Sequence, residues 1–320
     1  MPTSRLKNCN VILSKRAFIL AASAGLLTMS MPACAQAPAG KLKVVASFSI
    51  LADITRQIAG ERADVTSLVG ANSDAHVYRA TPQDAKTLKE ADLIVVNGLG
   101  FEGFMPRLIK SSGSKAPIIT ATTGIKTLEK KKAGGHDHGH GHDHGKVDPH
   151  AWQSVEAVKV FTSNIEKGLI ARDSANAAVY RANADTYRAK LDGLKVEIEN
   201  LISAIPSEKR IIVTNHDAFG YFAREFGIRF ESVQGISTEG EPSAKDIARV
   251  ITIAKDKKAR AVFVENMADP RIGAQLAKET GAKLGGALFS DALSDEKGPA
   301  PSYIALMKHN ARALTEALKD

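Results

Sequence analysis

Histidines crowd one short stretch of this chain. Five of the nine alternate with Gly and Asp within fifteen residues, and they are His136, His138, His140, His142 and His144. Neutral imidazoles bind zinc, copper or nickel, and so polar a tract has too little apolar surface to pack into a core. We interpret 136–144 as a loop that collects a transition metal. The alternative is a solvated linker that binds metal only incidentally, as a purification tag does.

Three more histidines lie in separate loops beside expected strand ends or helix starts. These are His76, His150 and His216. One such residue would more often be structural, but three in equivalent positions, in a chain that also carries a histidine tract, favour a shared metal site. Ligands of open parallel sheets bind beyond the carboxyl ends of the strands, where such loops converge. His309 lies within an expected terminal helix, and we expect it to be exposed and without a role.

Three imidazoles leave one position of a tetrahedral ion open. Asp291, which follows an expected strand, is the candidate fourth ligand, and it would close the site as in proteins that store or carry metal. Two alternatives stay open from spacing alone. Asp291 could instead cap a short helix, and Glu265, which also ends a strand, is the rival carboxylate.

Strands that alternate with helices must position these residues. In the first half, apolar runs predict strands at 42–48, 63–69, 92–97 and 117–121, and amphipathic segments predict helices at 50–59, 81–90, 104–111 and 155–171. The second half repeats this plan, with strands at 210–214, 230–233, 261–265 and 283–289 and helices at 219–225, 243–255, 271–280 and 303–318. We therefore predict an α/β fold of two parallel-sheet lobes, at 41–172 and 209–320, with the metal site between them.

A long segment without internal proline separates the two halves. Apolar residues from Val179 to Leu201 recur at helical spacing, so we predict one rigid connecting helix over 173–204. The alternative is two helices broken at Gly193.

The first 35 residues have the pattern of a secretory signal peptide. Four basic residues and no acid flank an apolar run, and Ala33-Cys34-Ala35 offers a small-residue cleavage site. The run is too short for a transmembrane helix. We expect cleavage after Ala35 and a periplasmic protein, with lipid anchoring at Cys34 as the less favoured alternative and a twin-arginine signal as a variant.

Composition limits the types of metal ligand and the classes of binding partner that the mature chain can have. Cleavage would remove both cysteines, so the metal ligands of the mature chain must be nitrogen and oxygen. The full chain carries a formal charge of +8, four units of which belong to the signal segment, and no basic stripe interleaved with aromatics occurs. We therefore expect no nucleic-acid partner. We also expect a monomer.

The loop motifs resemble the cluster A-I metal-binding proteins of bacterial ABC transporters (solute-binding family 9), in particular the zinc branch. The matching segments are Ser73 to Tyr78 with Thr81-Pro82, Asp148 to Trp152, His216 to Phe222, Ser237 to Ser243 and Phe289 to Ser294. This resemblance implies paired α/β lobes joined by a rigid helix, with His76, His150, His216 and Asp291 as the metal ligands. It also implies that a glutamate replaces His216 in the manganese branch.

We therefore predict an exported, non-enzymatic carrier that captures Zn²⁺ and delivers it to a membrane ABC permease, with a zinc metallochaperone as a further candidate partner. One alternative is an exported zinc hydrolase, for which Glu265 could serve as the base. Another is a histidine-tract metal buffer or adhesin without a transporter.

Overall fold

The computed structural model describes residues 40–129 and 147–319 of the chain. The predicted signal segment 1–35, with Cys34, and the histidine tract 136–144 lie outside the described residues. Within the described ranges, no helix combines the length and the apolar character needed to cross a membrane.

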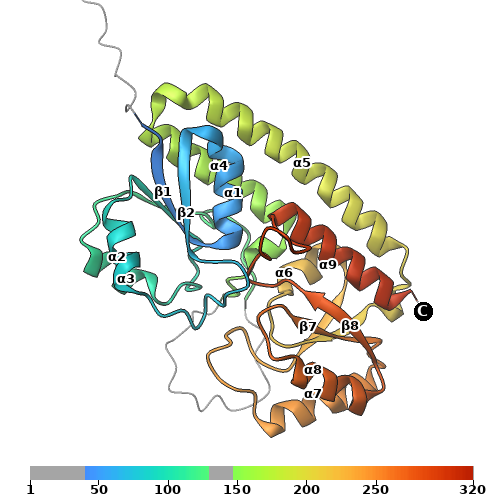
Figure 1. The fold of residues 1–320 in the computed structure, drawn as a ribbon. Coiled ribbons are helices and arrows are strands. Elements are labelled where there is room, and N and C mark those ends of the chain that lie inside the picture. The colour runs from blue at the N-terminus through green and yellow to red at the C-terminus, as the bar shows by residue number, and fades with distance from the viewer. Residues whose placement is uncertain (1–39, 130–146, 320) are drawn as a thin grey trace, which may run out of the picture. The chain divides into compact units, whose positions relative to one another are not determined.

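Two four-stranded sheets organise the described chain, and every strand pairing in them is parallel. The strand orders are β2-β1-β3-β4 and β6-β5-β7-β8. The strands are β1 (Leu42–Phe48), β2 (Ala63–Val69), β3 (Leu93–Val96), β4 (Ile118–Thr120), β5 (Ile211–Thr214), β6 (Arg229–Ser232), β7 (Ala261–Glu265) and β8 (Lys283–Leu288). The two sheets share one topology, so equivalent loops of both halves follow equivalent strands (Figure 1).

Helices cover both faces of each sheet. They are α1 (Ser49–Ala59), α2 (Pro82–Lys89), α3 (Met105–Ser112), α4 (Val155–Arg172), α5 (Ala177–Ser203), α6 (Gly220–Phe226), α7 (Ala244–Asp256), α8 (Pro270–Thr280) and α9 (Tyr303–Leu318). The two-lobe α/β prediction is confirmed, and the predicted boundaries of these elements agree to within one residue except at the start of α5.

Apolar burial explains this layering. One large core contains residues of both sheets together with α1, α4, α5 and α9. The opposite face of the first sheet packs against Leu88, Met105 and Leu108 of α2 and α3. The opposite face of the second sheet packs against Val250 and Leu276 of α7 and α8. The inner strands β1, β3, β5 and β7 are covered on both faces and are nearly continuously apolar, which is why these runs were readable from sequence.

The connecting helix α5 is a single element of 27 residues, about 40 Å long at 1.5 Å per residue. It starts later than predicted because Asp173 accepts hydrogen bonds from Asn176 Nδ2 and Tyr180 Oη, both at 2.7 Å, and a 3₁₀ turn over Ser174–Asn176 intervenes. Gly193 is exposed and does not break the helix. α5 packs against α1 and α4 of the first half and against α6 and α9 of the second. The lobe boundaries 41–172, 173–204 and 209–320 stay a prediction.

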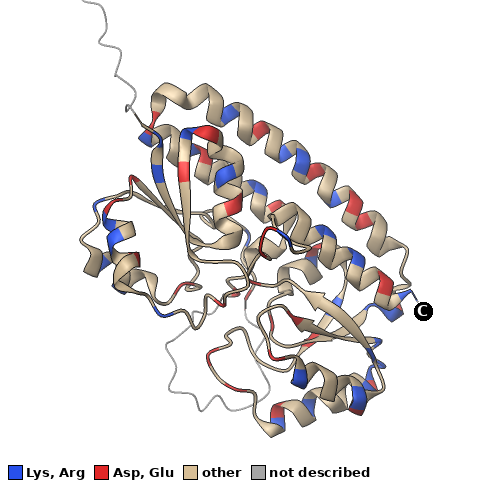
Figure 2. Ribbon diagram, in the orientation of Figure 1, with Lys and Arg blue, Asp and Glu red and all other residues tan. Residues whose placement is uncertain are grey.

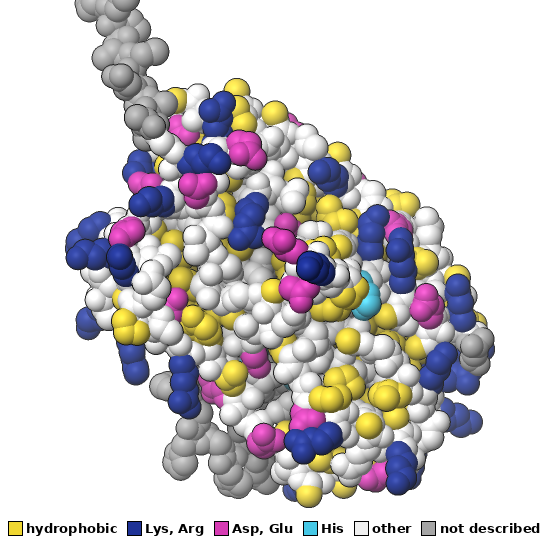
Figure 3. Space-filling view, viewed as in Figure 1, with side chains coloured by type: hydrophobic (Ala, Val, Ile, Leu, Met, Phe, Trp, Pro, Cys, Tyr) yellow, Lys and Arg dark blue, Asp and Glu magenta, His cyan; other side chains and the backbone are white. Residues whose placement is uncertain are grey.

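Charged side chains of both signs are interspersed over the described surface. Figure 2 shows Lys and Arg alternating with Asp and Glu along α5. Both signs also mix over the face of the molecule that Figure 3 shows. The outer side of α5 is therefore a solvated helix face, with several of its charges in ion pairs such as Lys195 with Glu156 and Arg188 with Glu166.

Candidate metal centre

His76 lies in the loop between β2 and α2. Its backbone N–H donates to Asp74 Oδ1 at 2.8 Å, an Asx turn that fixes the histidine relative to the aspartate. The hydroxyl of Thr238 donates to Asp74 Oδ2 at 2.6 Å and so ties this loop to the second half of the chain. The ring of Phe101 packs edge-on against the imidazole of His76, with 4.9 Å between centroids. Contacts from both halves of the chain therefore hold His76 in place.

His150 lies just before a 3₁₀ turn that leads into α4. Asp148 Oδ1 accepts from the His150 backbone N–H at 2.9 Å and lies 2.8 Å from its ring Nδ1. The indole of Trp152 packs against the ring, with 5.2 Å between centroids. With the Nδ1 proton donated to Asp148, Nε2 keeps its lone pair for an ion.

His216 follows β5 by two residues. Its backbone N–H donates to Glu265 Oε1 at 2.9 Å, and its ring Nδ1 contacts Glu265 Oε2. Glu265 is the last residue of β7, the strand next to β5. Glu265, the rival ligand in the sequence, therefore lies behind His216, on the side of the ring away from the other histidines.

Asp291 lies in the loop after β8, and hydrogen bonds from the first half of the chain hold this loop. The carbonyl oxygen of Ser290 accepts from Trp152 Nε1 at 2.7 Å and from Gln153 Nε2 at 2.8 Å. The backbone N–H of Leu293 donates to Ser49 Oγ at 3.0 Å. The carboxylate thus belongs to the second half by sequence but is positioned by both.

These four side chains bring their ligand atoms within 4.8 Å of one another. Asp291 Oδ2 lies 3.3 Å from His76 Nε2 and 3.2 Å from His216 Nε2, and the Nε2 atoms of His76 and His150 are 3.3 Å apart. A tetrahedral zinc ion with bonds of 2.0–2.1 Å has ligand-to-ligand edges of about 3.3–3.4 Å. The side chains are at most 2 % exposed, so the centre is closed to solvent.

The buried polar atoms of this centre suit a cation. Both carboxylate oxygens of Asp291 and the Nε2 of His216 are buried, and no hydrogen-bond partner among the described residues is aligned with them. A buried carboxylate without donors costs several kcal/mol, which a bound cation offsets. Asp148 and Glu265 add two more carboxylates directly behind the rings of His150 and His216. The donor set therefore fits a divalent metal ion.

The charges of the centre are strongly coupled. Burial opposes the charged form of Asp291, but His216 and His150 outweigh it and hold the pKa of Asp291 well below its usual range. Burial likewise opposes charge on His216, yet Glu265 and Asp291 raise its pKa well above the usual value. Burial lowers the pKa of His76. A metal ion entering the centre must displace protons from its ligands.

The structure brings together the four residues predicted as ligands and leaves others apart. His309 is half-buried instead of exposed, because its Nε2 lies 2.9 Å from the Ala287 carbonyl oxygen and its ring packs edge-on against Phe289. The role of Asp148 was missed, although its place two residues before a histidine is the signal of an Asx turn.

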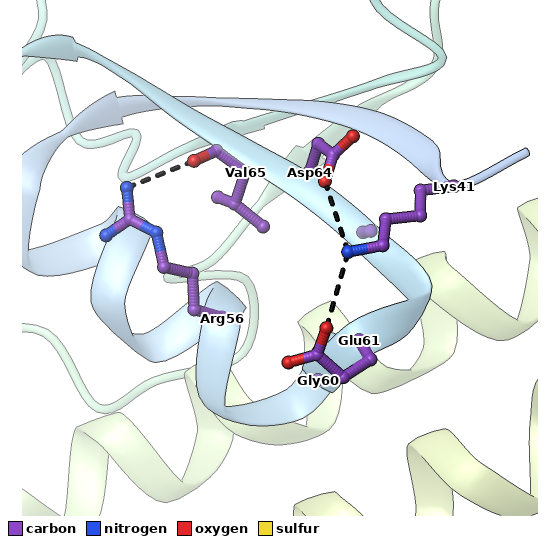
Figure 4. Close-up of a pocket in the computed structure, with 7 residues that line it drawn as sticks. Lys41, Arg56, Gly60, Glu61, Asp64 and Val65 are labelled. Carbon is purple, nitrogen blue, oxygen red and sulfur yellow. Dashed lines mark hydrogen bonds and ion pairs between the residues drawn. The ribbon is translucent and has the colours of Figure 1, made fainter.

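A surface depression beside Lys41 and Arg56 lies at the start of β2, at the opposite end of this strand from the loop of His76 (Figure 4).

Comparisons with known proteins agree on metal binding but not on the metal. Residues 44–317 match the family described as zinc-uptake complex component A, periplasmic. The iron-binding protein YfeA of Yersinia pestis is 35 % identical over 269 residues, which is 84 % of each chain. The manganese ABC transporter substrate-binding lipoprotein PsaA of Streptococcus pneumoniae is 32 % identical over 313 residues, 96 % of this chain and 98 % of the relative.

Solved structures share the whole fold. The periplasmic zinc-binding protein TroA from Treponema pallidum superposes with a TM-score of 0.80 at 27 % identity, over 88 % of this chain and 100 % of that one. A manganese-bound mutant of the periplasmic metal-binding protein from Candidatus Liberibacter asiaticus gives 0.78 at 33 % identity, over 87 % and 100 %. The chain therefore belongs to this family of metal-binding solute-binding proteins of ABC transporters, and it is an exported binding protein, not an enzyme.

Proposed function

We propose that this protein captures Zn²⁺ in the periplasm and delivers it to an ABC permease for import. His76, His150, His216 and Asp291 would be the four ligands. One observation carries the choice of metal: three imidazole nitrogens and one carboxylate converge, and three of their six separations, at 3.2 and 3.3 Å, match the edges of a tetrahedral zinc site. A fourth, between His150 Nε2 and Asp291 Oδ1, is longer at 3.7 Å.

Ligand chemistry supports zinc over manganese, one of the ions that relatives are named for. Manganese favours oxygen-rich, octahedral sites, whereas imidazole suits zinc. His216 supports the same choice, because the resemblance implies glutamate at its position in manganese carriers. Copper, nickel and iron also accept imidazole ligands, so the contrast applies to manganese.

The remaining parts of the proposal concern export and loading. We propose that residues 1–35 are a signal peptide and that the mature protein is a soluble monomer. Seven relatives are named as lipoproteins, which strengthens the alternative of a lipid anchor at Cys34. We also propose that His136, His138, His140, His142 and His144 gather zinc for the inner centre, with a metallochaperone as a possible donor.

The first test is a calorimetric titration of the metal-free mature protein with zinc and with manganese, in the presence of a competing chelator. We expect one tight zinc site, lost in His216→Ala, above weaker sites that persist. Tighter binding of manganese than of zinc would assign the protein to manganese transport instead. Weak sites that His216→Ala leaves unchanged would show that the chain is a metal buffer.

A second variant tests the collecting loop. Deletion of residues 136–144 should leave the affinity and stoichiometry of the inner site unchanged and slow its loading, because it removes five imidazoles that could bind zinc first and pass it on. Unchanged loading kinetics in stopped-flow measurements would remove the collector role and leave the inner site as the whole of the function.

A further inference from the structure

Glu265 holds three groups of the centre without being one of the four converging ligands. Oε1 accepts from the backbone N–H of His216 at 2.9 Å. Oε2 contacts Nδ1 of the same histidine and accepts from Ser290 Oγ at 2.7 Å. Ser290 precedes Asp291, so one carboxylate fixes both the histidine ring and the loop of the ligating carboxylate. Glu265 is itself 1 % exposed.

The register of the second sheet places Glu265 there. β5 and β7 pair in parallel with Ile212 opposite Ala261 and Val213 opposite Val262. The same offset of 49 residues brings His216 opposite Glu265 beyond the end of the ladder. A second link holds the two segments, because the backbone N–H of Glu265 donates to Asn215 Oδ1 at 3.1 Å. The contact is therefore built by strand pairing and not by a local turn.

The other two histidines of the centre are held differently. His150 depends on Asp148, two residues away, within its own turn. His76 Nδ1 is buried without a hydrogen-bond partner among the described residues. His216 is thus the ring whose direction depends on a distant residue of the same sheet. With its Nδ1 proton donated to Glu265, the ring presents Nε2 to the centre.

We propose that Glu265 is a positioning residue that directs His216 Nε2 into the metal centre and thereby sets the preference for zinc over manganese; this inference rests on the proposed zinc-carrier function. Zinc gains more than manganese from a third imidazole, because manganese favours oxygen ligands. A ring free to turn away leaves two histidines and one carboxylate, which is a poorer zinc site. The loss of binding affinity should therefore be larger for zinc than for manganese.

Glu265→Gln tests this inference with little change of volume. The amide has one acceptor oxygen and one NH₂ group, so it cannot accept both from the backbone N–H of His216 and from the pair formed by the His216 ring and Ser290. Loss of such an outer partner typically lowers metal affinity by about 10–100-fold. We expect a loss of that size for zinc, measured by chelator competition on the mature protein, and a smaller loss for manganese.

A double-mutant cycle separates positioning from general stability. If Glu265 acts mainly through His216, Glu265→Gln should cost much less zinc affinity in the His216→Ala protein than in the wild type, and the remainder reflects the bond to Ser290. The absorption spectrum of bound cobalt(II) should change in Glu265→Gln, because one nitrogen ligand turns away. Glu231→Gln is the matched control, since it removes a carboxylate of the edge strand β6 in the same sheet, where Glu231 pairs with Lys257 away from the centre.

Three outcomes would overturn the inference: wild-type zinc affinity in Glu265→Gln, losses that add fully in the double variant, or a cobalt spectrum that does not change. If Glu265→Gln does not fold, Glu265→Asp carries the same test, because it withdraws the carboxylate by one methylene and keeps the charge. A failure of the proposed function looks different, since the wild-type protein would then lack a tight zinc site altogether.

Discussion

Gly220→Ala should weaken metal binding from a position that touches no ligand. A Cβ at Gly220, the first residue of α6, would lie 2.6 Å from Asp148 Oδ2 and 3.6 Å from Leu128 Cδ1. Asp148 holds the ring and backbone of His150 through its other oxygen. Ordinary contact begins near 3.4 Å, so the carboxylate must move by about 0.8 Å. We expect His150 to lose its fixed direction.

The backbone around this contact cannot easily retreat to relieve it. The hydroxyl of Tyr221 donates to the Asp148 carbonyl oxygen at 3.0 Å and accepts from the backbone N–H of Leu128 at 3.1 Å. The shift therefore falls on the Asp148 side chain. Displacing such an outer partner lowers metal affinity by about 10–100-fold, which is about 1.4–2.7 kcal/mol. The helix itself gains up to about 1 kcal/mol from alanine, so stability without metal should change little.

Gly193→Ala is the matched control. Gly193 is exposed on α5, and its added Cβ would meet no atom within 4 Å. It should stabilise the metal-free protein by up to about 1 kcal/mol and leave zinc affinity unchanged. Both variants are compared by chelator competition for zinc and by urea unfolding in chelator. Wild-type zinc affinity in Gly220→Ala would refute the role assigned to Asp148, and equal losses in both variants would point to a general effect of helix substitution.

Three further predictions test the centre and the core. Zinc at about 100 times its Kd should add about 2.7 kcal/mol of stability and raise Tm by about 5–10 °C in calorimetry, and a Tm that zinc leaves unchanged would contradict a closed site that binds only the folded state. Trp152, the one tryptophan, packs on His150, so its fluorescence should change on metal binding. Trp152→Phe removes the Nε1 donor to the Ser290 carbonyl oxygen and should lower the free energy of unfolding in urea by about 1 kcal/mol. An unchanged free energy of unfolding would mean that Gln153 alone holds that carbonyl. Burial raises the pKa of Asp53, so the folded protein binds this proton more tightly than the unfolded chain, and the group destabilises the fold increasingly as pH rises above its unfolded pKa. In urea unfolding with chelator, Asp53→Asn should therefore gain more stability relative to wild type at pH 7 than at pH 4. An advantage that shrinks toward neutral pH would show that the charge itself stabilises the fold.

Much of the fold was readable from sequence because its signals are local. The first strand is apolar at nearly every position, and a strand covered on both faces must be so. The apolar residues of α5 recur at helical spacing because one side of the helix lies on the core. The four converging residues could be predicted for a similar reason, since each follows a recognisable strand end or begins a turn, and parallel sheets bring such loops together.

Tertiary structure alone decided which carboxylate converges with the three histidines. Glu265 ends a strand and Asp291 follows one, and no local pattern separates them. The register of β5 with β7 places Glu265 behind His216, and hydrogen bonds from Trp152 and Gln153 place the loop of Asp291 in front of it. These contacts join residues 49 to 138 positions apart, so they exist only after the sheets and the shared core have formed. The sequence therefore determined which side chains could bind a metal, and the folded structure decided which of them converge and which hold the converging ones in place.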